Sequence, residues 1–292
     1  MTKCTICPRN CGADRTAGHA GVCGMPADPV LARAMLHMWE EPCISGERGS
    51  GAVFFSGCSL KCVFCQNVQI STGGFGKHIS VGRLREIFFE LIEQGAHNIN
   101  LVNPTHYADA ILQALEGGLP VPVVYNTGGY DKLETLRRLE GHVDVYLPDF
   151  KYADTAPAWR YSAAGDYPET AKRAILEMFR QTGPWRADAD GILQKGVVIR
   201  HMILPDNLEN TYRVIDWVAE TFRPGDVLFS LMSQYTPCGN LSAFPELQRR
   251  LTREEYDAAM DHLADSGIED GFFQELSSAK EEYIPAFDLQ GI

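Results

Sequence analysis

The sequence predicts an α/β fold, a partial (β/α)₆ barrel of the TIM type with an N-terminal cysteine-rich, metal-binding extension. Three observations predict it. Short apolar runs alternate with amphipathic stretches from about residue 52 to residue 265, polar residues follow the ends of these runs, and eight of the nine cysteines lie within the first 65 residues. We therefore expect the extension over residues 1–50, and the barrel with a C-terminal tail over residues 51–292.

Six short apolar runs predict the strands of the barrel. They cover residues 52–56, 98–102, 121–125, 143–147, 197–204 and 227–231. Apolar residues at helical spacing predict the helices between the runs, the first of them capped by Ser80. These helices cover residues 81–92, 107–115, 132–139, 169–181, 208–221 and 253–264. Since strands and helices alternate, we expect parallel strands whose carboxyl ends gather at one face.

Composition and charge argue against several classes of protein. The chain has 292 residues with 38 acidic side chains and 26 Lys or Arg, and its net charge of −12 comes with no basic block, so a nucleic-acid partner is not expected. No apolar run approaches the roughly 18 residues of a membrane span, so no membrane partner is expected. The sequence begins Met-Thr-Lys and then enters a cysteine cluster rather than an apolar stretch, which predicts a cytoplasmic protein with reduced thiols.

Three cysteines with the spacing C-x₃-C-x₂-C follow the first barrel strand directly. Cys58, Cys62 and Cys65 have the spacing to bind three corners of a [4Fe–4S] cluster, and we predict them as the catalytic metal ligands. One iron is then left without a protein ligand, which opens a position for a cofactor or a substrate. The alternatives are a zinc knuckle or three buried thiols, but zinc normally takes a fourth protein ligand and none lies close in the sequence.

A second set of four cysteines precedes the barrel. Cys4, Cys7, Cys11 and Cys23 lie within twenty residues, among glycines and a proline that form tight turns. Disulfides do not fit a reduced compartment, so the set predicts a second metal site. Four thiolates suit structural zinc and also an auxiliary [4Fe–4S] cluster, and the knuckle-like turns favour zinc. His19 is a further ligand candidate that would replace one cysteine.

The loop of Cys58, with the aromatic Phe64 before its last cysteine, resembles the radical S-adenosylmethionine (SAM) superfamily. Within that superfamily, residues 57–67 are similar to the cluster loop of the pyruvate formate-lyase activating enzymes, and the stretch 274–288 resembles one branch of that group. The resemblance implies an anaerobic oxidoreductase that binds a [4Fe–4S] cluster and cleaves SAM to a 5′-deoxyadenosyl radical. It also implies an electron donor of the flavodoxin or ferredoxin type and, as in an activase of glycyl-radical enzymes, a protein or peptide substrate.

The resemblance implies where SAM binds. We expect its amino and carboxylate groups on the open iron, near Phe64 and beside Asn103 and Thr105. The ribose and methionine ends are expected against polar residues at or after later strands, which are Asn126, Thr127, Asp149, Lys151 and Arg200. Arg200 matches a strand arginine that faces the cofactor in the activases, and a guanidinium pairs bidentately with a carboxylate. The alternatives are an internal ion pair for Arg200 and a mutual pair for Asp149 and Lys151.

The chain departs from the activases in two places. The activases end their second strand with Gly-Gly-Glu, whose backbone binds the amino group of the cofactor, whereas Pro104 stands in this stretch and has no N–H. The activases also have a histidine in a late loop, where this chain has residues 234–237 without one. The substrate class therefore stays open between a protein or peptide and a small molecule or nucleoside. A third hypothesis is that the chain is a non-catalytic interaction protein whose cysteines hold structural zinc.

Five further residues are candidates for a role in or near the site. His106 and His201 are candidates for acid–base chemistry, although a single histidine is more often a hydrogen-bonded structural group. Tyr235 is expected either to line the substrate cavity or to pack at the mouth of the barrel. Cys43 and Cys238 lie outside the two cysteine sets and are expected to be buried thiols.

Overall fold

The structure, a computed structural model, describes residues 3–276 and 286–292. Its centre is a ten-stranded sheet with the strand order β10-β9-β8-β6-β5-β4-β2-β1-β3, and with β7 paired to β8. The strands are β1 (Val30–His37), β2 (Ser50–Phe55), β3 (Lys77–His78), β4 (Ile99–Val102), β5 (Val123–Thr127), β6 (Val145–Pro148), β7 (Arg186–Ala187), β8 (Leu193–Met202), β9 (Leu228–Met232) and β10 (Gly271–Phe273).

The six predicted strands form the parallel core of this sheet. β2, β4, β5, β6, β8 and β9 lie next to one another in chain order, and each pairs in parallel with the next. Leu101 of β4, for example, is in register with Val53 of β2 and with Tyr125 of β5. All three side chains are buried, as the middle of a parallel sheet requires. The predicted α/β fold with a mostly parallel sheet is therefore confirmed.

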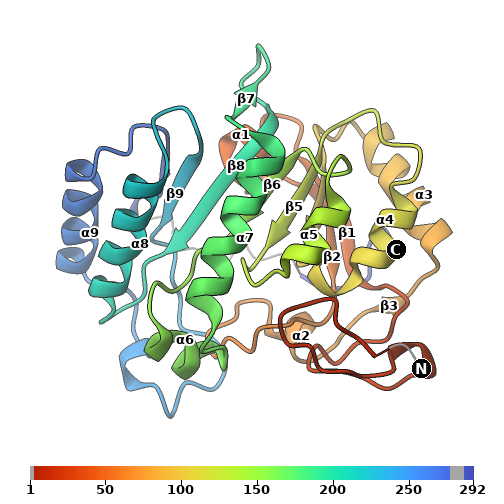
Figure 1. Ribbon diagram of the computed structural model, residues 1–292, viewed down its shortest axis with the longest axis horizontal. Helices are drawn as coiled ribbons and strands as arrows, with labels where there is room; N and C mark the ends of the chain where they lie inside the picture. The colour runs from red at the N-terminus through yellow and green to blue at the C-terminus, as the bar shows by residue number, and fades with distance from the viewer. Residues whose placement is uncertain (1–2, 277–285) are drawn as a thin grey trace.

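The predicted helices cover one face of the sheet (Figure 1). They are α3 (Val81–Glu93), α4 (Ala108–Ala114), α5 (Leu133–Leu139), α7 (Tyr167–Thr182), α8 (Leu208–Thr221) and α9 (Arg253–Asp265). The hydroxyl oxygen of Ser80 accepts a hydrogen bond from the Arg83 amide at 3.1 Å, which makes Ser80 the predicted cap of α3. Three short helices were not predicted: α1 (Pro42–Ser45), α2 (Val68–Ser71) and α6 (Thr155–Ser162). In the described part of the chain, no helix is long and apolar enough to cross a membrane.

The sheet is open, and both of its ends carry strands that were not predicted. β1 is antiparallel to β2, from Leu31 opposite Phe55 to His37 opposite Ser50. Residues 30–37 therefore belong to the main sheet, although they lie in the range expected for the extension; the described chain before β1 lies outside the sheet. β10 extends the opposite end of the sheet in parallel with β9. A division of the chain at residue 50 stays a prediction.

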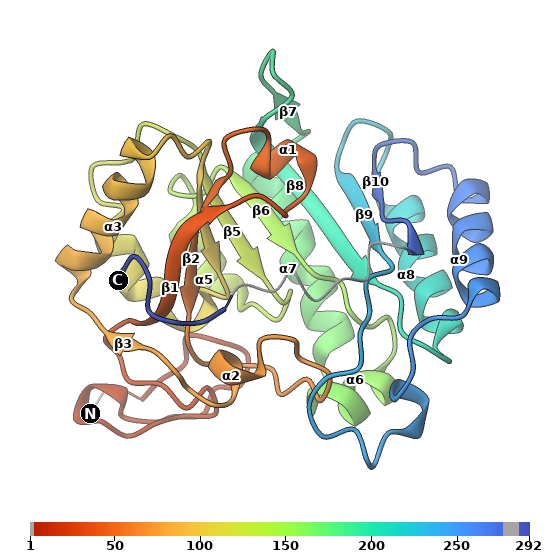
Figure 2. The same cartoon turned by 180° about the vertical axis from the view of Figure 1, so that it is seen from behind.

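The C-terminal residues run beside β1 (Figure 2). The Leu289 amide donates a hydrogen bond to the Ala32 carbonyl at 3.1 Å, and the Ala34 amide donates to the Gln290 carbonyl at 2.9 Å. The described end of the tail therefore covers the β1 edge. Most of the stretch 274–288, which carries part of the family resemblance, lies outside the described residues.

Different segments occupy the two ends of the parallel strands. α1 lies near their amino ends, where Ile44 packs in one buried cluster with Val124, Val145, Val198 and Leu228. The loop of Cys58 follows β2 and lies with α2 at the carboxyl ends (Figures 1 and 2). We call the end of the parallel strands that carries α1 the floor, and the end that carries the cysteine loop the mouth.

Both histidines considered for acid–base chemistry are buried and bonded to the backbone. His106 Nε2 lies 2.7 Å from the Ser56 carbonyl oxygen, and burial lowers the pKa of His106 to about 3. His201 Nδ1 lies 2.7 Å from the Phe150 carbonyl oxygen, and burial lowers the pKa of His201 to about 4. Both rings are therefore neutral near pH 7, and the structure gives each a structural role.

The buried His201 predicts loss of stability in acid. Between about pH 6.5 and pH 4 the unfolded chain binds a proton at this ring and the folded chain does not, so the free energy of unfolding falls as the pH falls. The contribution approaches about 1.4 kcal/mol for each pH unit inside this window. His201→Gln keeps an N–H donor and removes the titration, so urea unfolding at pH 7 and pH 5 should show a smaller pH dependence than in wild type. Equal pH dependence in the two proteins would contradict the assignment.

Candidate metal and cofactor site

The cysteine loop leaves β2 through a glycine that no other residue can replace without strain. Gly57 has φ +83°, and a Cβ atom at this position would clash with the side chain of Met25 and lie 2.9 Å from the Cys23 carbonyl oxygen. Cys58 follows directly. The loop is therefore held between the end of a buried strand and the N-terminal cysteine segment.

The three thiols of the loop each receive a hydrogen bond. The Leu60 amide donates to Cys58 Sγ at 3.4 Å, the Ser162 hydroxyl donates to Cys62 Sγ at 3.0 Å, and the Ser71 hydroxyl donates to Cys65 Sγ at 3.2 Å. Hydrogen bonds to sulfur favour the thiolate, which is the form that ligates metals. Neither serine is among the predicted site residues: Ser162 follows Cys62 by 100 residues and only the fold brings it to the loop, whereas Ser71 follows Cys65 by six residues.

The electrostatics of the loop require a positive group to hold three thiolates together. Burial, with the neighbouring thiols Cys62 and Cys65, raises the pKa of Cys58 to about 12. Burial also raises the pKa of Cys62, although the ammonium of Lys151 opposes the shift. A bound metal centre supplies the charge that deprotonates such thiols.

Three cysteine thiols on one loop are the donor type that iron–sulfur clusters use. Across the described residues, no group of three or more His, Cys, Asp or Glu side chains converges as the ligands of a single metal ion do. An iron–sulfur cube binds each thiolate to a different iron, so its ligands need not converge on one point.

A cavity of about 730 Å³ opens beside this loop inside the barrel. Ten of the eleven residues that are predicted to bind the cluster or SAM line it: Cys58, Cys62, Phe64, Cys65, Asn103, Asn126, Thr127, Asp149, Lys151 and Arg200. Phe272 and Phe273 of β10 line it too, as do His37 and Trp39 at the other end of the sheet. Because both ends of the sheet reach one cavity, the open sheet curls around it, as a partial barrel does.

Thr105 is the predicted residue that does not line this cavity. Its hydroxyl donates to Asp131 Oδ1 at 2.8 Å, and the Thr127 hydroxyl donates to Asp131 Oδ2 at 2.6 Å. The Tyr125 hydroxyl also donates to Asp131 Oδ1, at 3.1 Å. Asp131 is buried, and its burial raises its pKa even though three hydroxyl groups oppose the shift. This buried network fixes the carboxyl ends of β4 and β5, and the sequence analysis did not find it.

Arg200 is engaged with protein groups on three sides. Its Nε donates to Asp149 at 2.9 Å, its Nη1 donates to Glu40 at 3.0 Å, and its Nη2 donates to Asn126 at 2.7 Å. The alternative of an internal ion pair is therefore present in this structure. Pairing of Arg200 with a cofactor carboxylate stays a prediction.

Asp149 and Lys151 form the mutual pair that was the alternative to cofactor binding. Lys151 Nζ lies 2.5 Å from Asp149 Oδ2. Burial opposes both charges, but Lys151 and Arg200 together hold the pKa of Asp149 below its usual range. In the same way, burial is overcome by Asp149, which raises the pKa of Lys151. Both groups are therefore charged near pH 7 while facing the cavity.

Two glutamates on the floor of the cavity were not predicted. Glu40 accepts hydrogen bonds from Asn126 at 3.0 Å and Asn100 at 3.3 Å, besides the bond from Arg200. Glu41 Oε2 lies 3.8 Å from Arg200 Nη1 and has no hydrogen-bond partner among the described residues. Burial and the charge of Glu40 raise the pKa of Glu41, although Arg200 opposes the shift. Nothing in the sequence marks these glutamates, because they follow a strand that was itself not predicted.

Tyr235 and Cys238 support the loop from outside the cavity. Cys238 is half-buried, not fully buried as expected; its thiol donates to the Phe64 carbonyl oxygen at 3.1 Å, and this partial burial raises its pKa to about 11. The Tyr235 hydroxyl donates to the Leu247 carbonyl, and its ring lies 6.1 Å from that of Phe64. Tyr235 therefore packs rather than lining the cavity. Cys43 is buried, as expected, and burial raises its pKa to about 12.

The four N-terminal cysteines gather around Cys7. Burial, together with the charges of Cys23, Cys4 and Cys11, raises the pKa of Cys7 to about 11, while the Arg9 amide opposes the shift. Burial acts on Cys11 in the same sense, but amide hydrogen bonds from Ala13 and Val22 outweigh it and lower the pKa of Cys11. In the described part of the chain these four thiols do not converge as the ligands of a single metal ion do, so the second metal site stays a prediction.

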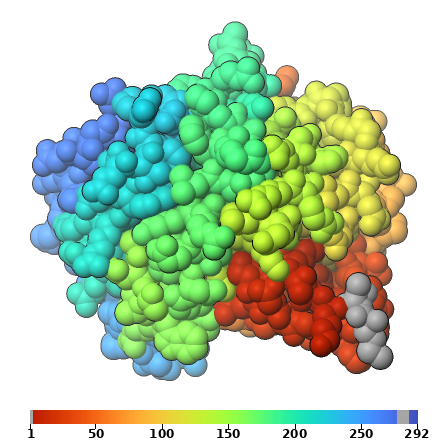
Figure 3. Space-filling model, viewed as in Figure 1, coloured from red at the N-terminus to blue at the C-terminus, as the bar shows by residue number. Residues whose placement is uncertain are grey.

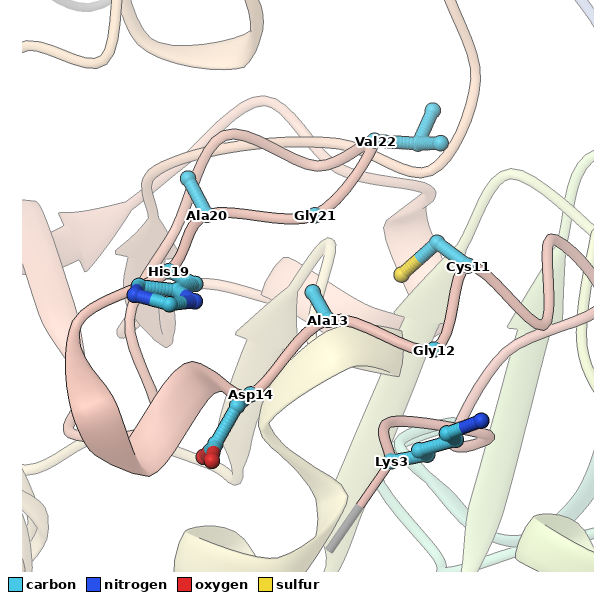
Figure 4. A pocket seen from close by; sticks show the side chains of 9 residues that line it. All are labelled: Lys3, Cys11, Gly12, Ala13, Asp14, His19, Ala20, Gly21 and Val22. Atoms are coloured by element: carbon cyan, nitrogen blue, oxygen red, sulfur yellow. The ribbon is translucent and has the colours of Figure 1, made fainter. Parts of the chain in front are cut away.

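A surface hollow of about 500 Å³ opens beside Cys11, between the stretches 11–14 and 19–22 (Figure 4). His19, the further ligand candidate, lies at the far end of this hollow from Cys11 (Figure 4). The N-terminal segment from residue 3 onward packs against the body of the protein (Figure 3). The identity of its metal stays a prediction.

Comparison with known proteins identifies a relative that aligns with most of this chain. No protein-family model matches the chain. The uncharacterized protein MJ0674 of Methanocaldococcus jannaschii is 30% identical over 269 residues, which cover 89% of this chain and 73% of that protein. This chain belongs to the family of MJ0674. No activity comes with that membership, because the name of this archaeal relative assigns none.

Structures of SuiB share the fold of this MJ0674 family member. SuiB of Streptococcus suis bound to its precursor peptide SuiA superposes with a TM-score of 0.52 and 13% identity over 78% of this chain. SuiB bound to S-adenosylmethionine gives a TM-score of 0.52 and 14% identity over 77% of this chain. This chain spans about half the length of the SuiB chains, 49% and 50%. A domain of a pyruvate formate-lyase activating enzyme from Bacteroides vulgatus superposes with a TM-score of 0.40 and 14% identity over 59% of this chain.

Removing the guanidinium should destabilise the fold. Arg200→Gln leaves Glu40 and Asp149 without their shared cation inside the barrel, and we expect the free energy of unfolding to fall by about 3–5 kcal/mol. Urea denaturation of the metal-free protein measures the change. Arg213→Gln is the matched control, because Arg213 pairs with Glu209 and Asp154 at the surface and its loss should change little. Equal effects of the two substitutions would show that the network inside the barrel carries no stability.

Proposed function

We propose that this chain is a radical SAM enzyme of the oxidoreductase class. The observation that carries the proposal is the loop of three free cysteines at the carboxyl end of a parallel strand, opening on a large cavity walled by buried charges. Two further findings support it. The barrel fold is shared with SuiB, and a structure of SuiB contains S-adenosylmethionine.

In this proposal Cys58, Cys62 and Cys65 hold a [4Fe–4S] cluster and the cavity holds SAM. The thiols fit the cluster because they are reduced, share one loop and receive hydrogen bonds that favour thiolates. When bound and reduced, the cluster supplies the electron that cleaves SAM, and the resulting 5′-deoxyadenosyl radical takes a hydrogen atom from the substrate. The volume of about 730 Å³ falls within the range of cofactor pockets.

The side chains of this chain position the cofactor and keep water away. Asn103 and Phe64 border the cysteine loop, and Asn103 Oδ1 lies 3.5 Å from Cys58 Sγ. Asn126, Thr127, Asp149 and Lys151 offer hydrogen-bonding groups to the ribose and methionine ends, with Arg200 as the cation for a carboxylate. Apolar residues such as Leu60 line the same space and exclude water from a reactive radical.

The proposed substrate is a protein or peptide. A structure of SuiB contains its precursor peptide. Phe273 of β10 lines that cavity and is 60% exposed, so an apolar side chain is available to a large partner at the rim. A small molecule or nucleoside is the alternative, and deoxyadenosine formation stimulated by a small compound would identify it.

For the N-terminal cysteines, we propose a second metal site with zinc favoured over an auxiliary [4Fe–4S] cluster. For the first cluster, we propose a flavodoxin or ferredoxin as the electron donor. Iron and zinc analysis of anaerobically purified wild type and of a Cys58→Ala, Cys62→Ala, Cys65→Ala triple variant decides the metals. Zinc kept while iron is lost supports one site of each kind.

The central test is cleavage of SAM. Anaerobic protein reduced with dithionite should convert SAM to methionine and 5′-deoxyadenosine, measured by chromatography. Each of the changes Cys58→Ala, Cys62→Ala and Cys65→Ala should abolish the product and the visible absorbance of the cluster, because each removes a ligand. Cys43→Ala, at a buried cysteine outside both sets, serves as the matched control and should keep the activity. A loop variant with full activity would refute the ligand assignment, and wild-type protein without cleavage would favour the zinc-stapled interaction protein.

Hydrogen bonding to the cluster gives a separate prediction. Ser162→Ala should keep the iron content and lower the reduction potential, because a hydrogen bond to a ligand sulfur stabilises the reduced, more negative state. A redox titration followed by electron paramagnetic resonance measures the shift. Ser242→Ala, at an exposed serine, should leave the potential unchanged. An unchanged potential in Ser162→Ala would mean that this hydroxyl does not bond to a cluster ligand.

A further inference from the structure

We propose that Arg9 couples the N-terminal cysteine site to the loop of Cys58, so that metal bound by the first set positions the ligands of the second. The proposal rests on the proposed metal binding at the N-terminal set. In this proposal the N-terminal cysteines control the position of the loop of Cys58, besides stabilising their own segment. Arg9 is thereby a positioning residue.

Arg9 stands inside the N-terminal site, between Cys7 and Cys11. The Asn10 amide donates a hydrogen bond to the Cys7 carbonyl at 3.1 Å, and the turn that this bond closes contains Arg9. The backbone of Arg9 is therefore fixed by a ligand of the proposed second metal. Any change in the position of Cys7 moves the point from which the Arg9 side chain extends.

The Arg9 side chain reaches three carbonyl oxygens at the other cysteine loop. Nε donates to the Ser59 carbonyl at 2.8 Å, Nη1 donates to the Ala163 carbonyl at 2.5 Å, and Nη2 donates to the Ser162 carbonyl at 3.2 Å. Ser59 directly follows Cys58, and the Ser162 hydroxyl donates to Cys62 Sγ at 3.0 Å. A single guanidinium therefore holds the backbone next to one cluster ligand and the residue that hydrogen-bonds another.

The geometry excludes a loose surface contact. Arg9 is half-buried, and its guanidinium also lies 5.3 Å from the ring centroid of Tyr130. The Ser162 carbonyl accepts a further hydrogen bond from the Lys61 amide at 3.4 Å, and the Tyr161 carbonyl accepts one from the Val63 amide at 2.9 Å. The end of α6 and the cysteine loop thus form one hydrogen-bonded unit, and Arg9 ties the N-terminal segment to it.

A second arginine of the same segment strengthens the link. Arg15 lies between Cys11 and Cys23, is buried, and donates to the Met25 carbonyl at 3.1 Å and to the His106 carbonyl at 2.5 Å. His106 Nε2 in turn lies 2.7 Å from the Ser56 carbonyl, two residues before Cys58. The N-terminal segment is therefore linked to the chain on both sides of Cys58, directly at Ser59 and through His106 at Ser56.

The experiment separates this coupling from metal binding at the catalytic loop. In the Cys58→Ala, Cys62→Ala, Cys65→Ala protein only the N-terminal set can take metal, so zinc can act on residues 57–66 only through the N-terminal segment. Hydrogen exchange by mass spectrometry compares this protein loaded with zinc and treated with a chelator. Removing zinc should speed exchange in residues 57–66 about tenfold, the loss expected when charge-assisted hydrogen bonds worth roughly 1.4 kcal/mol or more are released.

Variants at residue 9 identify the connection. Adding Arg9→Gln should leave zinc bound, while residues 57–66 exchange fast with or without zinc. Arg9→Lys keeps the charge but donates from one nitrogen, so it should restore part of the protection. Arg250→Gln makes the same substitution at an exposed arginine and should keep the full effect of zinc. Loop exchange that ignores zinc while residues 3–25 respond to it would overturn the coupling, as would a protein that binds no zinc.

A second measurement covers the intact protein, in case the triple variant does not fold. In anaerobically reconstituted protein, Arg9→Gln should change the electron paramagnetic resonance signal and lower the reduction potential of the cluster at unchanged iron and zinc content, with Arg250→Gln as control. An unchanged signal and potential would overturn the proposal. Absence of SAM cleavage in wild type would instead refute the proposed function, and the exchange experiment does not depend on it.

Discussion

The guanidinium of Arg200 holds the interior of the barrel together. It extends from β8 to Asp149 after β6, to Asn126 of β5 and to Glu40 in the segment after β1. Without this cation, the carboxylates of Glu40 and Asp149 would lose their shared counter-charge in a buried, low-dielectric environment. The curl of the sheet around its cavity and the position of the floor therefore depend on one side chain, and the hydrogen-bonding groups of the cavity wall are placed by it.

The same network sets the electrostatics of the cysteine loop. Arg200 and Lys151 balance Glu40 and Asp149, while burial and the neighbouring charge of Glu40 favour a protonated Glu41. The charge is uneven along the wall, because Lys151 favours the thiolate of Cys62 and Asp149 disfavours it. A change in the ion pair between Asp149 and Arg200 therefore alters the charge around Lys151. Lys151 in turn acts on the thiol of Cys62, a proposed cluster ligand. The wall and the loop act as one electrostatic unit.

The parallel strands and the cysteine ligand candidates were predictable because their signals are local. A buried strand such as β4 shows as a short apolar run, and C-x₃-C-x₂-C places three thiols on one loop whatever the rest of the chain does. β1 was missed because glycines, prolines and cysteines surround its apolar run. α6 was missed because its eight residues carry too few apolar positions to show a helical period. Ser162, at the end of α6, was lost with it.

Arg200 shows what a single sequence cannot reveal about a buried charge. The sequence places an arginine on a barrel strand, where a buried guanidinium must have partners, and a cofactor carboxylate is one such partner. The structure supplies protein partners from residues 40, 126 and 149, three segments that no spacing connects. Buried charges are stabilised as a set, so the role of one member follows from the others. For a carboxylate ligand to bind Arg200, it must either displace Glu40 or share the guanidinium with it, and the affinity of this cavity for such a ligand depends on that competition.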